Sequence, residues 1–539
     1  MNKLFEQLLK KRQIDQDFLH PKYENLKDPF LLNDMEKAVE RIKKAVSSQE
    51  KVMIYGDYDV DGVTASTVME EALIVSGLNP QNITIMLPDR FADGYGMSPK
   101  LIERAKEKQI TLVITVDCGS RNHAIVEELN TLKIDTIITD HHECEDTLPE
   151  ALAVINPKRK DSQEIQESLH NLAGVGVAFK VAQALKKENL IPDGQEKWLL
   201  DLVLLGTICD SMSLTGENRI LCYYGIKVLE KTRRKGLIEL MKSAHVKTIN
   251  SESIGFQLGP RLNAAGRLET ADISLNLLRA KSSPEAAALA AKLEELNAKR
   301  RVEQTAATKE IDQRGISSDP VIIEVGKWHE GILGIVAGRL VETYKKPAFV
   351  LAEIDNNILK GSGRSFGEFS LADALEHVSD TILGGGGHAG AAGVRLEQKN
   401  LYNFREKINA YYNSLNLKDQ EKYLKTTADL DVEDLTEINE ELVENLKLLE
   451  PFGPENEDPI FCFKNARIES TTRMGADQNH LRLDIVDKKG NKLKLVAFYA
   501  PEKWLALDTE STYDIQFRPT ENEFRSVRSV EGRILDISF

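Results

Sequence analysis

Short apolar runs of strand length alternate with helical stretches between residues 50 and 155. The runs are Val52–Tyr55, Ile83–Leu87, Leu112–Val116, Ile134–Ile138 and Leu152–Ile155. Most are rich in β-branched residues, and continuous apolar runs are typical of strands buried on both faces of a parallel sheet. The stretches between them, such as Val63–Val75 and His123–Leu132, are long enough for crossover helices. We therefore expect a doubly wound α/β domain here.

The hydrophobic spacing then becomes helical. Residues 197–210 are almost continuously apolar and predict a buried helix. Ser283-Pro284-Glu285 is typical of a helix start, with Ser283 as the capping residue and Pro284 at the first helical position. Leucines at helical spacing follow, so we expect a long helix to about residue 312 that separates two domains.

Two further patterns follow this helix. Val321–Val325 and Ala348–Leu351 are expected as strands of a second α/β unit over residues 319–400, with Ile332–Tyr344 as the helix between them. From about residue 425, five strand-like segments recur at short intervals: Phe461–Ile468, Leu481–Ile485, Leu493–Tyr499, Tyr513–Phe517 and Ile534–Ile537. Five short strands in series favour a small β-barrel of the OB-fold type.

The apolar runs, the N-terminus and the cysteines indicate the cellular location of the protein. No apolar run approaches the ~20 residues that span a bilayer, and the N-terminus lacks the pattern of a secretory signal. The five cysteines form no CxxC pair, so neither a zinc ribbon nor a disulfide framework is indicated. We therefore expect a cytoplasmic protein with no membrane partner.

The charge of the chain bears on its partners. The net charge of −15 argues mildly against nucleic-acid binding, but an acidic metal site contributes to it and binding depends on local patches. Three short basic clusters, at residues 158–160, 233–235 and 299–301, are interpreted as solvated surface.

The strongest chemical signal is the alternation of Asp57, Asp59 and Asp61 directly after the strand Val52–Tyr55. The carboxyl end of a parallel strand is where α/β folds place ligands. Such crowded acids are costly unless a cation neutralises them. A calcium loop of the EF-hand type requires an entering helix and a Glu six residues after the glycine. Here a strand enters and Val68 occupies that position, so the EF-hand interpretation fails.

Further candidate ligands follow other strands. Asp117 ends one strand, Asp140 ends the next and is followed by His141 and His142, and Asp210 closes the apolar helix. Oxygen ligands with imidazole suit Mn²⁺ or Mg²⁺. There are more acidic residues than one cation requires as ligands. Two ions about 3.5–4 Å apart would form the clamp used in phosphoryl hydrolysis.

These motifs together resemble the DHH phosphoesterases. The segments that carry the resemblance are 55–64, Asp117, Asp140-His141-His142, Asp210, 259–267, Trp328-His329-Glu330-Gly331 and 449–454, and it covers residues 20–539. The resemblance implies that Asp59, Asp61, Asp117, His141 and Asp210 bind two metal ions, Mn²⁺ or Mg²⁺. Asp57 contacts a metal directly or supports a ligand. His142 orients a ligand or touches the scissile phosphate.

The second unit contains candidates for phosphate binding. Four consecutive glycines, including Gly385 and Gly386, let backbone amides approach an anion closely. The resemblance is to the DHH-associated domain, in which Ser362, Arg364, His388 and His329 would bind phosphate. It also implies that Arg261, Asn263 and Arg267 line the groove of the incoming strand. For the two arginines, a capping or ion-pair role stays open.

The resemblance implies a division into five parts. They are an N-terminal arm (1–45), a DHH domain (46–215), a helical connector (216–315), a DHH-associated domain (316–415) and an OB-fold (425–539). The implied activity is 5′→3′ hydrolysis of single-stranded DNA in recombination and repair, by a monomer with a single-strand-binding protein and a helicase as partners. Two alternatives stay open: a phosphodiesterase of short oligonucleotides or cyclic dinucleotides, and a non-catalytic scaffold.

Overall fold

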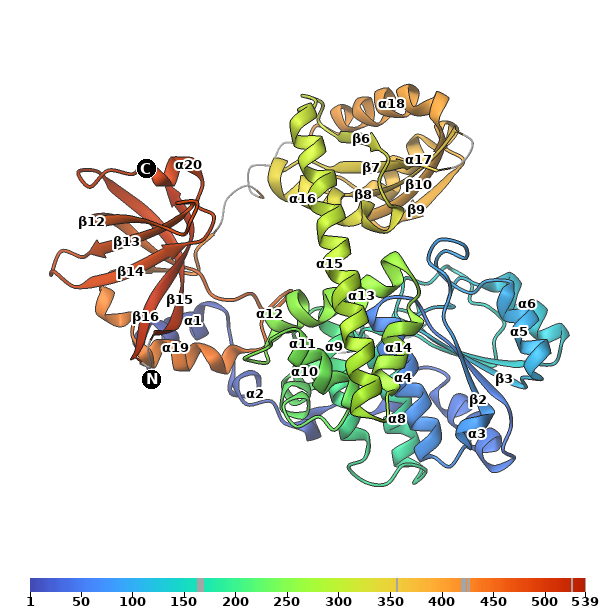
Figure 1. The fold of residues 1–539 in the computed structure, drawn as a ribbon. Helices are drawn as coiled ribbons and strands as arrows, with labels where there is room; N and C mark the ends of the chain where they lie inside the picture. Colours follow the sequence, from blue (N-terminus) through green and yellow to red (C-terminus); the bar gives the residue numbers. More distant parts are fainter. Residues whose placement is uncertain (162–168, 355–356, 418–422, 424–426, 525–526, 539) are drawn as a thin grey trace. The chain divides into compact units, whose positions relative to one another are not determined.

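The computed structural model comprises residues 1–539 and describes all of them except 162–168, 355–356, 418–422, 424–426, 525–526 and 539 (Figure 1). The chain divides into two compact units. One contains residues 1–26, 213–223 and 425–539, and the other contains residues 27–212 and 224–424. None of the helices in the described part of the chain has the length and apolar content that a membrane crossing requires.

The first sheet of the larger unit has five parallel strands in the order β2-β1-β3-β4-β5. They are β1 (Val52–Tyr55), β2 (Ile83–Met86), β3 (Leu112–Val116), β4 (Asp135–Thr139) and β5 (Ala153–Ile155). Helices α5 (Lys100–Lys108) and α6 (His123–Thr131) share a core with one face, and α4 (Val60–Val75) and α8 (Gly174–Lys187) contact the strands elsewhere. The expected doubly wound domain is confirmed, with β4 beginning one residue later than the apolar run.

A helical connector follows the first sheet. Its elements are α9 (Leu200–Cys209), α10 (Gly216–Leu229), α11 (Lys235–Ser243), α12 (Ser251–Ser253), the π-helix η5 (Ile254–Leu258), α13 (Gly259–Leu268), α14 (Asp272–Arg279) and α15 (Ser283–Arg314). The long helix is confirmed, but Ser283 is not its cap. Ser282 has an extended backbone and its hydroxyl accepts from the amide of Glu285, so Ser283 is already helical.

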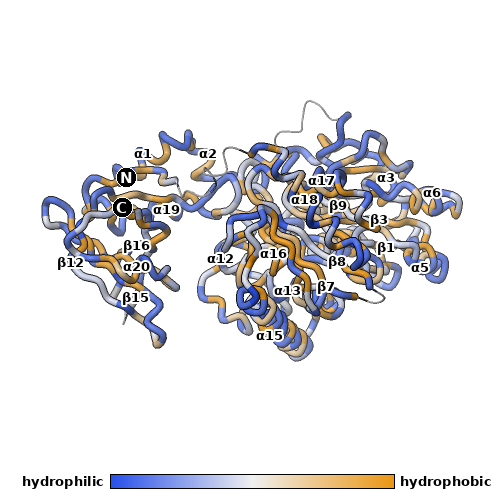
Figure 2. The backbone as a smooth tube through the Cα atoms, turned by 90° about the horizontal axis from the view of Figure 1, so that it is seen from above, coloured by the Kyte–Doolittle hydropathy of each residue, from blue (hydrophilic) through white to orange (hydrophobic). Residues whose placement is uncertain are grey.

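Helix α15 contributes to two packing regions of the larger unit. It contacts α11, α13 and α14. Near its end, Ala307 and Ile311 enter the core beneath the second sheet. This sheet has the order β6-β7-β8-β10-β9, with β6 (Ile322–Gly326), β7 (Ala348–Glu353), β8 (Ile358–Arg364), β9 (Gly384–Gly387) and β10 (Ala391–Glu397). Helix α16 (Leu333–Tyr344) packs on one face with α15, while α17 (Leu371–His377) and α18 (Leu401–Ser414) pack on the other. Strand β7 and helix α16 are mostly hydrophobic in Figure 2.

The glycine run has a definite secondary structure. Gly384–Gly387 forms the edge strand β9, which pairs antiparallel with β10 from Ala392 to Arg395. All four glycines are exposed. Because only one side of an edge strand is paired, the other side presents backbone groups to the solvent.

The smaller unit is built around a β-barrel. Its strands are β11 (Leu430–Val432), β12 (Phe461–Met474), β13 (His480–Val486), β14 (Lys492–Ala497), β15 (Thr512–Phe524) and β16 (Val527–Ser538). The order is β11-β12-β13-β14-β16-β15, and an additional β12–β15 pairing closes the five long strands into a barrel. The expected barrel is confirmed. The short strand β11 pairs with the first residues of β12, and Phe498 and Tyr499 lie beyond the end of β14.

N-terminal residues belong to the same core as the barrel. Leu4 and Leu8 from α1 (Lys3–Lys11) and Leu19 from α2 (Gln16–Leu19) pack with barrel residues. Arg219, only 2% exposed, donates to the carbonyl oxygens of Phe18, Leu448 and Leu449. One buried guanidinium therefore joins three segments that are distant in sequence.

Candidate metal centre

The loop after β1 holds its three aspartates in a tight arrangement. Asp59 caps helix α4, since its Oδ1 accepts from the amide of Gly62 at 3.1 Å. A Cβ at Gly62 would lie 2.5 Å from backbone atoms of Asp57, so this turn requires glycine. Both carboxylate oxygens of Asp61 accept from backbone amides at the start of α8, from Gly174 at 2.7 Å and Val175 at 2.9 Å. The positive end of that helix therefore orients Asp61.

Asp117 follows β3 with a left-handed backbone, at φ 61°. Its amide donates to the carbonyl of Thr139 at 2.9 Å, which holds this uncommon conformation. A Cβ on Gly174 would lie 2.5 Å from Asp117, so helix α8 approaches as closely as glycine allows. Backbone strain of this kind is often found at functional sites.

Asp140 organises the two histidines rather than joining the ligand clusters. It accepts from the amides of Ser120 at 2.9 Å, His141 at 2.8 Å and His142 at 3.1 Å. The Nδ1 of His142 lies 2.9 Å from the same carboxylate. Burial by itself would raise the pKa of Asp140, but the hydrogen bond and charge of His142 lower it. Asp140 thus stays ionised.

The predicted ligands converge. The Nε2 of His141 lies 3.1 Å from Asp117, 3.5 Å from Asp210 and 3.8 Å from Asp61, measured to carboxylate oxygens. Three groups could each hold a cation: Asp57, Asp59 and Asp117; Asp61, His141 and Asp210; and Asp117, His141 and His142. Side chains spread over more than 150 residues of sequence therefore surround one place at the carboxyl edge of the sheet.

Electrostatics shows that these acids need a counter-charge. Burial, followed by the charge of Asp59, raises the pKa of Asp61 to about 7 and that of Asp57 well above its usual range. Burial and the neighbouring carboxylates also raise the pKa of Asp210 to about 8 and shift that of Asp117 strongly upward. Burial lowers the pKa of His141 to about 3, so its imidazole is neutral, as a metal ligand requires.

The residues present fit two divalent cations. Within the described residues, no hydrogen bond reaches the buried Oδ1 of Asp57, the Oδ1 of Asp117 or the Nε2 of His141. Buried polar atoms without partners are uncommon and costly. Carboxylate oxygens, which make up most of this donor set, are the ligands that Mn²⁺ and Mg²⁺ prefer.

The candidates in the second α/β domain lie in different places. Burial alternates along β8, so Ser362 and Arg364 share its partly exposed face, and the Nη1 of Arg364 donates to the Ser362 hydroxyl at 3.2 Å. His388 follows the exposed edge strand that contains Gly385 and Gly386, and its ring stacks at 6.4 Å on that of His142. His329 caps the short helix η6 (Glu330–Ile332) with its Nδ1, which accepts from the amide of Gly331.

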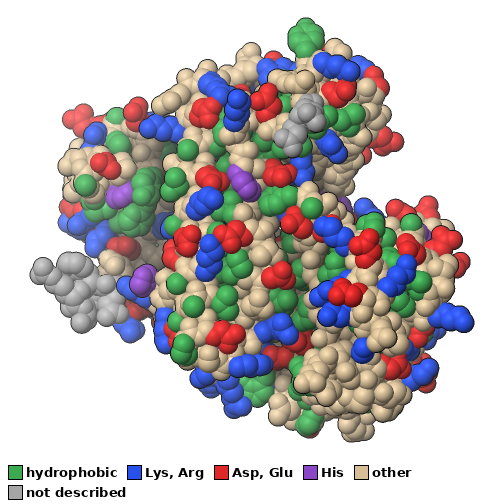
Figure 3. Space-filling model, turned by 45° about the vertical axis from the view of Figure 1, so that its right-hand side comes forward, with side chains coloured by type: hydrophobic (Ala, Val, Ile, Leu, Met, Phe, Trp, Pro, Cys, Tyr) green, Lys and Arg blue, Asp and Glu red, His purple; other side chains and the backbone are tan. Residues whose placement is uncertain are grey.

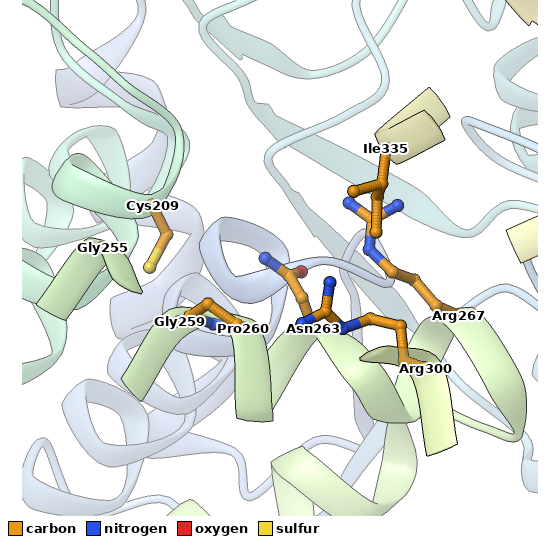
Figure 4. A pocket seen from close by; sticks show the side chains of 8 residues that line it. All are labelled: Cys209, Gly255, Gly259, Pro260, Asn263, Arg267, Arg300 and Ile335. Atoms are coloured by element: carbon orange, nitrogen blue, oxygen red, sulfur yellow. The ribbon is translucent and has the colours of Figure 1, made fainter. Parts of the chain in front are cut away.

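The three candidate residues on α13 have different surroundings in the structure. Arg261 forms an ion pair with Glu294 at 2.5 Å, which is the alternative left open from the sequence. Asn263 and Arg267 line a pocket instead (Figure 4). Arg267 donates a weak hydrogen bond to the carbonyl of Gly331 at 3.4 Å.

Two residues near the site carry no signal in the sequence. Arg90 lies 4.8 Å over the ring of Tyr58 and its charge reaches Arg267 and Arg364. The hydroxyl of Tyr95 lies 2.8 Å from the Nδ1 of His142. Both come from the irregular segment between β2 and α5, where no periodicity or motif marks them.

Known proteins share this domain order. Residues 51–207 match the model of the DHH family N-terminal domain, residues 318–414 the DHHA1 domain, and residues 429–536 the RecJ OB domain. The single-stranded-DNA-specific exonuclease RecJ of Bacillus subtilis is 36% identical over 527 residues, covering 96% of this chain. The RecJ of Dickeya dadantii is 32% identical, covering 94% of this chain and 90% of that protein.

Solved structures agree with these matches. The crystal structure of RecJ with Mn²⁺ from Thermus thermophilus superposes with a TM-score of 0.84 at 26% identity, covering 100% of this chain and 76% of that one. The chain spans 65% of the length of the Bacillus protein, so part of that relative has no counterpart here. The shared domains and the extent of identity show that the chain belongs to the RecJ family of DHH proteins.

Proposed function

We propose that this chain is an exonuclease that hydrolyses single-stranded DNA from its 5′ end in DNA recombination and repair. The observation that carries the proposal is the presence of two adjacent groups of candidate ligands, Asp57 with Asp59 and Asp117, and Asp61 with His141 and Asp210. Relatives named as single-stranded-DNA-specific exonucleases support the choice of substrate.

The metal ligands of this proposal are Asp57, Asp59, Asp61, Asp117, His141 and Asp210. When bound, two divalent cations would lower the pKa of a water molecule and offset charge on the phosphoryl oxygens. The protein provides the deprotonated carboxylates and a neutral imidazole. The close approach of α8 holds Asp61 and Asp117 in place before any ion binds.

His142 is proposed to bind the scissile phosphate. Burial lowers its pKa, but the hydrogen bond and charge of Asp140 outweigh this and raise it. The imidazole therefore holds protons more firmly than usual and, with Nδ1 turned to Asp140, its Nε2 can donate to a phosphate oxygen. The stacked His388 would face the same phosphate from the second α/β domain. Arg364, at the end of β8, would add a charged hydrogen bond.

The barrel is proposed to bind the single strand. Phe498 and Tyr499 are 57% and 77% exposed, and the ring of His480 packs edge-on against both. Tyr499 has a left-handed backbone at φ 54°, and its amide donates to the Nδ1 of His480 at 3.0 Å. Two aromatic faces held toward solvent suit stacking with bases of any sequence. This surface favours long strands over the alternative substrates, short oligonucleotides and cyclic dinucleotides.

The test compares substrates with the full chain and Mn²⁺. We expect a 5′ label on single-stranded DNA to be released first as a mononucleotide, with little hydrolysis of duplex. A higher kcat/KM on a dinucleotide than on a 20-mer would favour the alternative, and early release of a 3′ label would contradict the polarity. Asp117→Ala should abolish hydrolysis, whereas Asp146→Asn, at a side chain 90% exposed, serves as the control.

The proposal also includes the cellular compartment, the oligomeric state and the protein partners. All five cysteines are free, as expected in a reducing compartment such as the cytoplasm. We infer a monomer that cooperates with a single-strand-binding protein and a helicase. Co-elution of the purified chain with each candidate partner, with and without DNA, would test these contacts.

A further inference from the structure

A closed ring of hydrogen bonds connects His142 to Asn156, the residue that directly follows β5. The side-chain nitrogen of Asn156 donates to the carbonyl oxygen of His142 and to the hydroxyl of Ser120, each at 2.9 Å. The backbone amide of Ser120 donates to Asp140 at 2.9 Å, and the Nδ1 of His142 lies 2.9 Å from the same carboxylate. Four residues from three separate segments therefore hold one another.

The partners of the Asn156 side chain fix its orientation. The carbonyl of His142 can only accept, so it must face the NH₂ group of Asn156. The backbone amide of Lys158 can only donate, and it donates to the Oδ1 of Asn156 at 2.8 Å. Both hydrogens of the NH₂ group and one lone pair of the oxygen are therefore used. A leucine of similar size would satisfy none of these partners.

The ring is shielded from water. Asn156, Ser120 and Asp140 are each 1% exposed. Because no solvent replaces a lost partner in such a place, a fully bonded polar network holds a single arrangement. The three residues follow β5, β3 and β4, which are neighbours in the sheet. The ring therefore fixes the segment that carries His142 relative to three strand ends.

A buried arginine anchors the segment that carries Asn156. Arg159, 8% exposed, donates to the carbonyl of Val154 and pairs with Asp34, both at 2.7 Å. Arg159 and Arg234 are the middle residues of two basic clusters, and each lies largely inside the protein in ion pairs with two carboxylates. This corrects their interpretation as solvated surface. On the face shown in Figure 3, by contrast, basic and acidic side chains are interspersed at the surface.

We propose that Asn156 is a positioning residue for His142 in the hydrolysis. The inference rests on the proposed function, in which His142 binds the scissile phosphate. Asp140 orients the imidazole through its Nδ1, and Asn156 fixes the main chain of the same residue, so the Nε2 keeps one direction. Neither Asn156 nor Ser120 belongs to the three groups of candidate metal ligands. Asn156 therefore acts on the phosphate through His142 and not through the metal ions.

The first experiment replaces Asn156 with leucine, which has a similar size and no hydrogen-bonding group. Hydrolysis of a 5′-labelled single-stranded 20-mer is measured over ranges of substrate and Mn²⁺ concentration. Since a displacement of ~1 Å in a catalytic arrangement can cost ~10²-fold in rate, kcat should fall by about that factor. KM and the midpoint of Mn²⁺ activation should each change less than about threefold, because strand binding and the metal ligands are left intact.

Asn456→Leu is the matched control. Asn456 is 3% exposed, and its side-chain nitrogen donates to the carbonyls of Leu449 and Pro451 at 2.9 and 2.8 Å. The same substitution there removes buried hydrogen bonds of the same kind in the unit that contains the barrel. It should lower the melting temperature but change kcat less than about threefold. An equal fall of kcat in both variants would show that loss of any buried asparagine has this effect, and the inference would be wrong.

A double-mutant cycle separates positioning from support of the fold. Single-turnover rates are compared for Asn156→Leu, His142→Ala and the double variant. If Asn156 acts through His142, adding Asn156→Leu to His142→Ala should change the rate less than about threefold. If the two losses multiply, the inference is wrong. Where circular dichroism shows that Asn156→Leu does not fold, Ser120→Ala enters the same cycle, because it removes one bond of the ring and keeps the backbone amide that holds Asp140.

The outcomes separate this inference from the proposed function. If the wild-type chain does not hydrolyse single-stranded DNA, the proposed function is wrong. If the wild-type chain hydrolyses it and a folded Asn156→Leu variant keeps the wild-type kcat, the positioning role alone is wrong.

Discussion

Replacing Gly174 with alanine tests how the metal ligands are held. Gly174 is the first residue of α8, and its amide donates to Asp61 at 2.7 Å. A Cβ here would lie 2.5 Å from both the Cβ and the Oδ1 of Asp117. Ordinary contacts of a Cβ begin at 3.4 Å. One methyl group therefore forces Asp117 or the start of α8 to move by about 1 Å.

The expected loss follows from that displacement. Asp117 belongs to two of the three ligand groups, one with Asp57 and Asp59 and the other with His141 and His142, so its movement disturbs both of these groups at once. A misplacement of about 1 Å in a catalytic arrangement can cost ~10²-fold in rate. We expect kcat to fall by about that factor, and the midpoint of Mn²⁺ activation to rise.

Gly176→Ala is the control on the same helix. Its Cβ would lie 3.1 Å from a terminal carbon of Leu172, a flexible side chain that can shift. Hydrolysis of a 5′-labelled single strand is followed over a range of Mn²⁺ concentrations, and circular dichroism verifies the fold. Activity of Gly174→Ala within threefold of the wild type, in a folded protein, would refute the argument that this contact positions Asp117.

Three further predictions concern the metal-free protein, the barrel and a buried ion pair. Because the pKa of Asp61 is about 7 and that of Asp210 about 8, the metal-free folded state keeps protons that the unfolded chain releases above about pH 4. The melting temperature without metal should therefore fall as pH rises from about 5 to 8, and Mn²⁺ should reverse the trend; a flat profile would contradict the pKa shifts. Phe498→Ala and Tyr499→Ala should each weaken binding of a 20-mer by ~1–3 kcal/mol in anisotropy titrations, and unchanged affinity in both would exclude this surface. Arg234→Met leaves two carboxylates without their partner and should lower the free energy of unfolding by ~3–5 kcal/mol in urea titrations; a change below about 1 kcal/mol would show that the pair is not needed.

Apolar runs predicted the bounds of a strand correctly where the strand is buried along its whole length. The strands Val52–Tyr55 and Leu112–Val116 have the bounds of their apolar runs. Both are covered by helices on each face, so no polar position interrupts them. The predicted bounds were wrong where the backbone conformation of a nearby residue ends the strand. The third strand expected in the barrel ends at Ala497 because Tyr499 turns into a left-handed conformation.

The positions of Asp57–Asp61, Asp117, His141 and Asp210 at the ends of predicted elements already indicated a metal site, because parallel strands bring their carboxyl ends to one edge. The tertiary structure alone decided which polar residues are left without a partner. The sequence indicated Arg261 as a residue of the groove and Arg300 as part of a solvated cluster, yet Arg261 forms an ion pair with Glu294 and Arg300 lines a pocket. The role of Gly174 was likewise hidden, because it depends on the packing of α8 against β3. The sequence determines the chemistry of each side chain. The charges and the free space around that side chain come from other segments, which only the folded structure brings together.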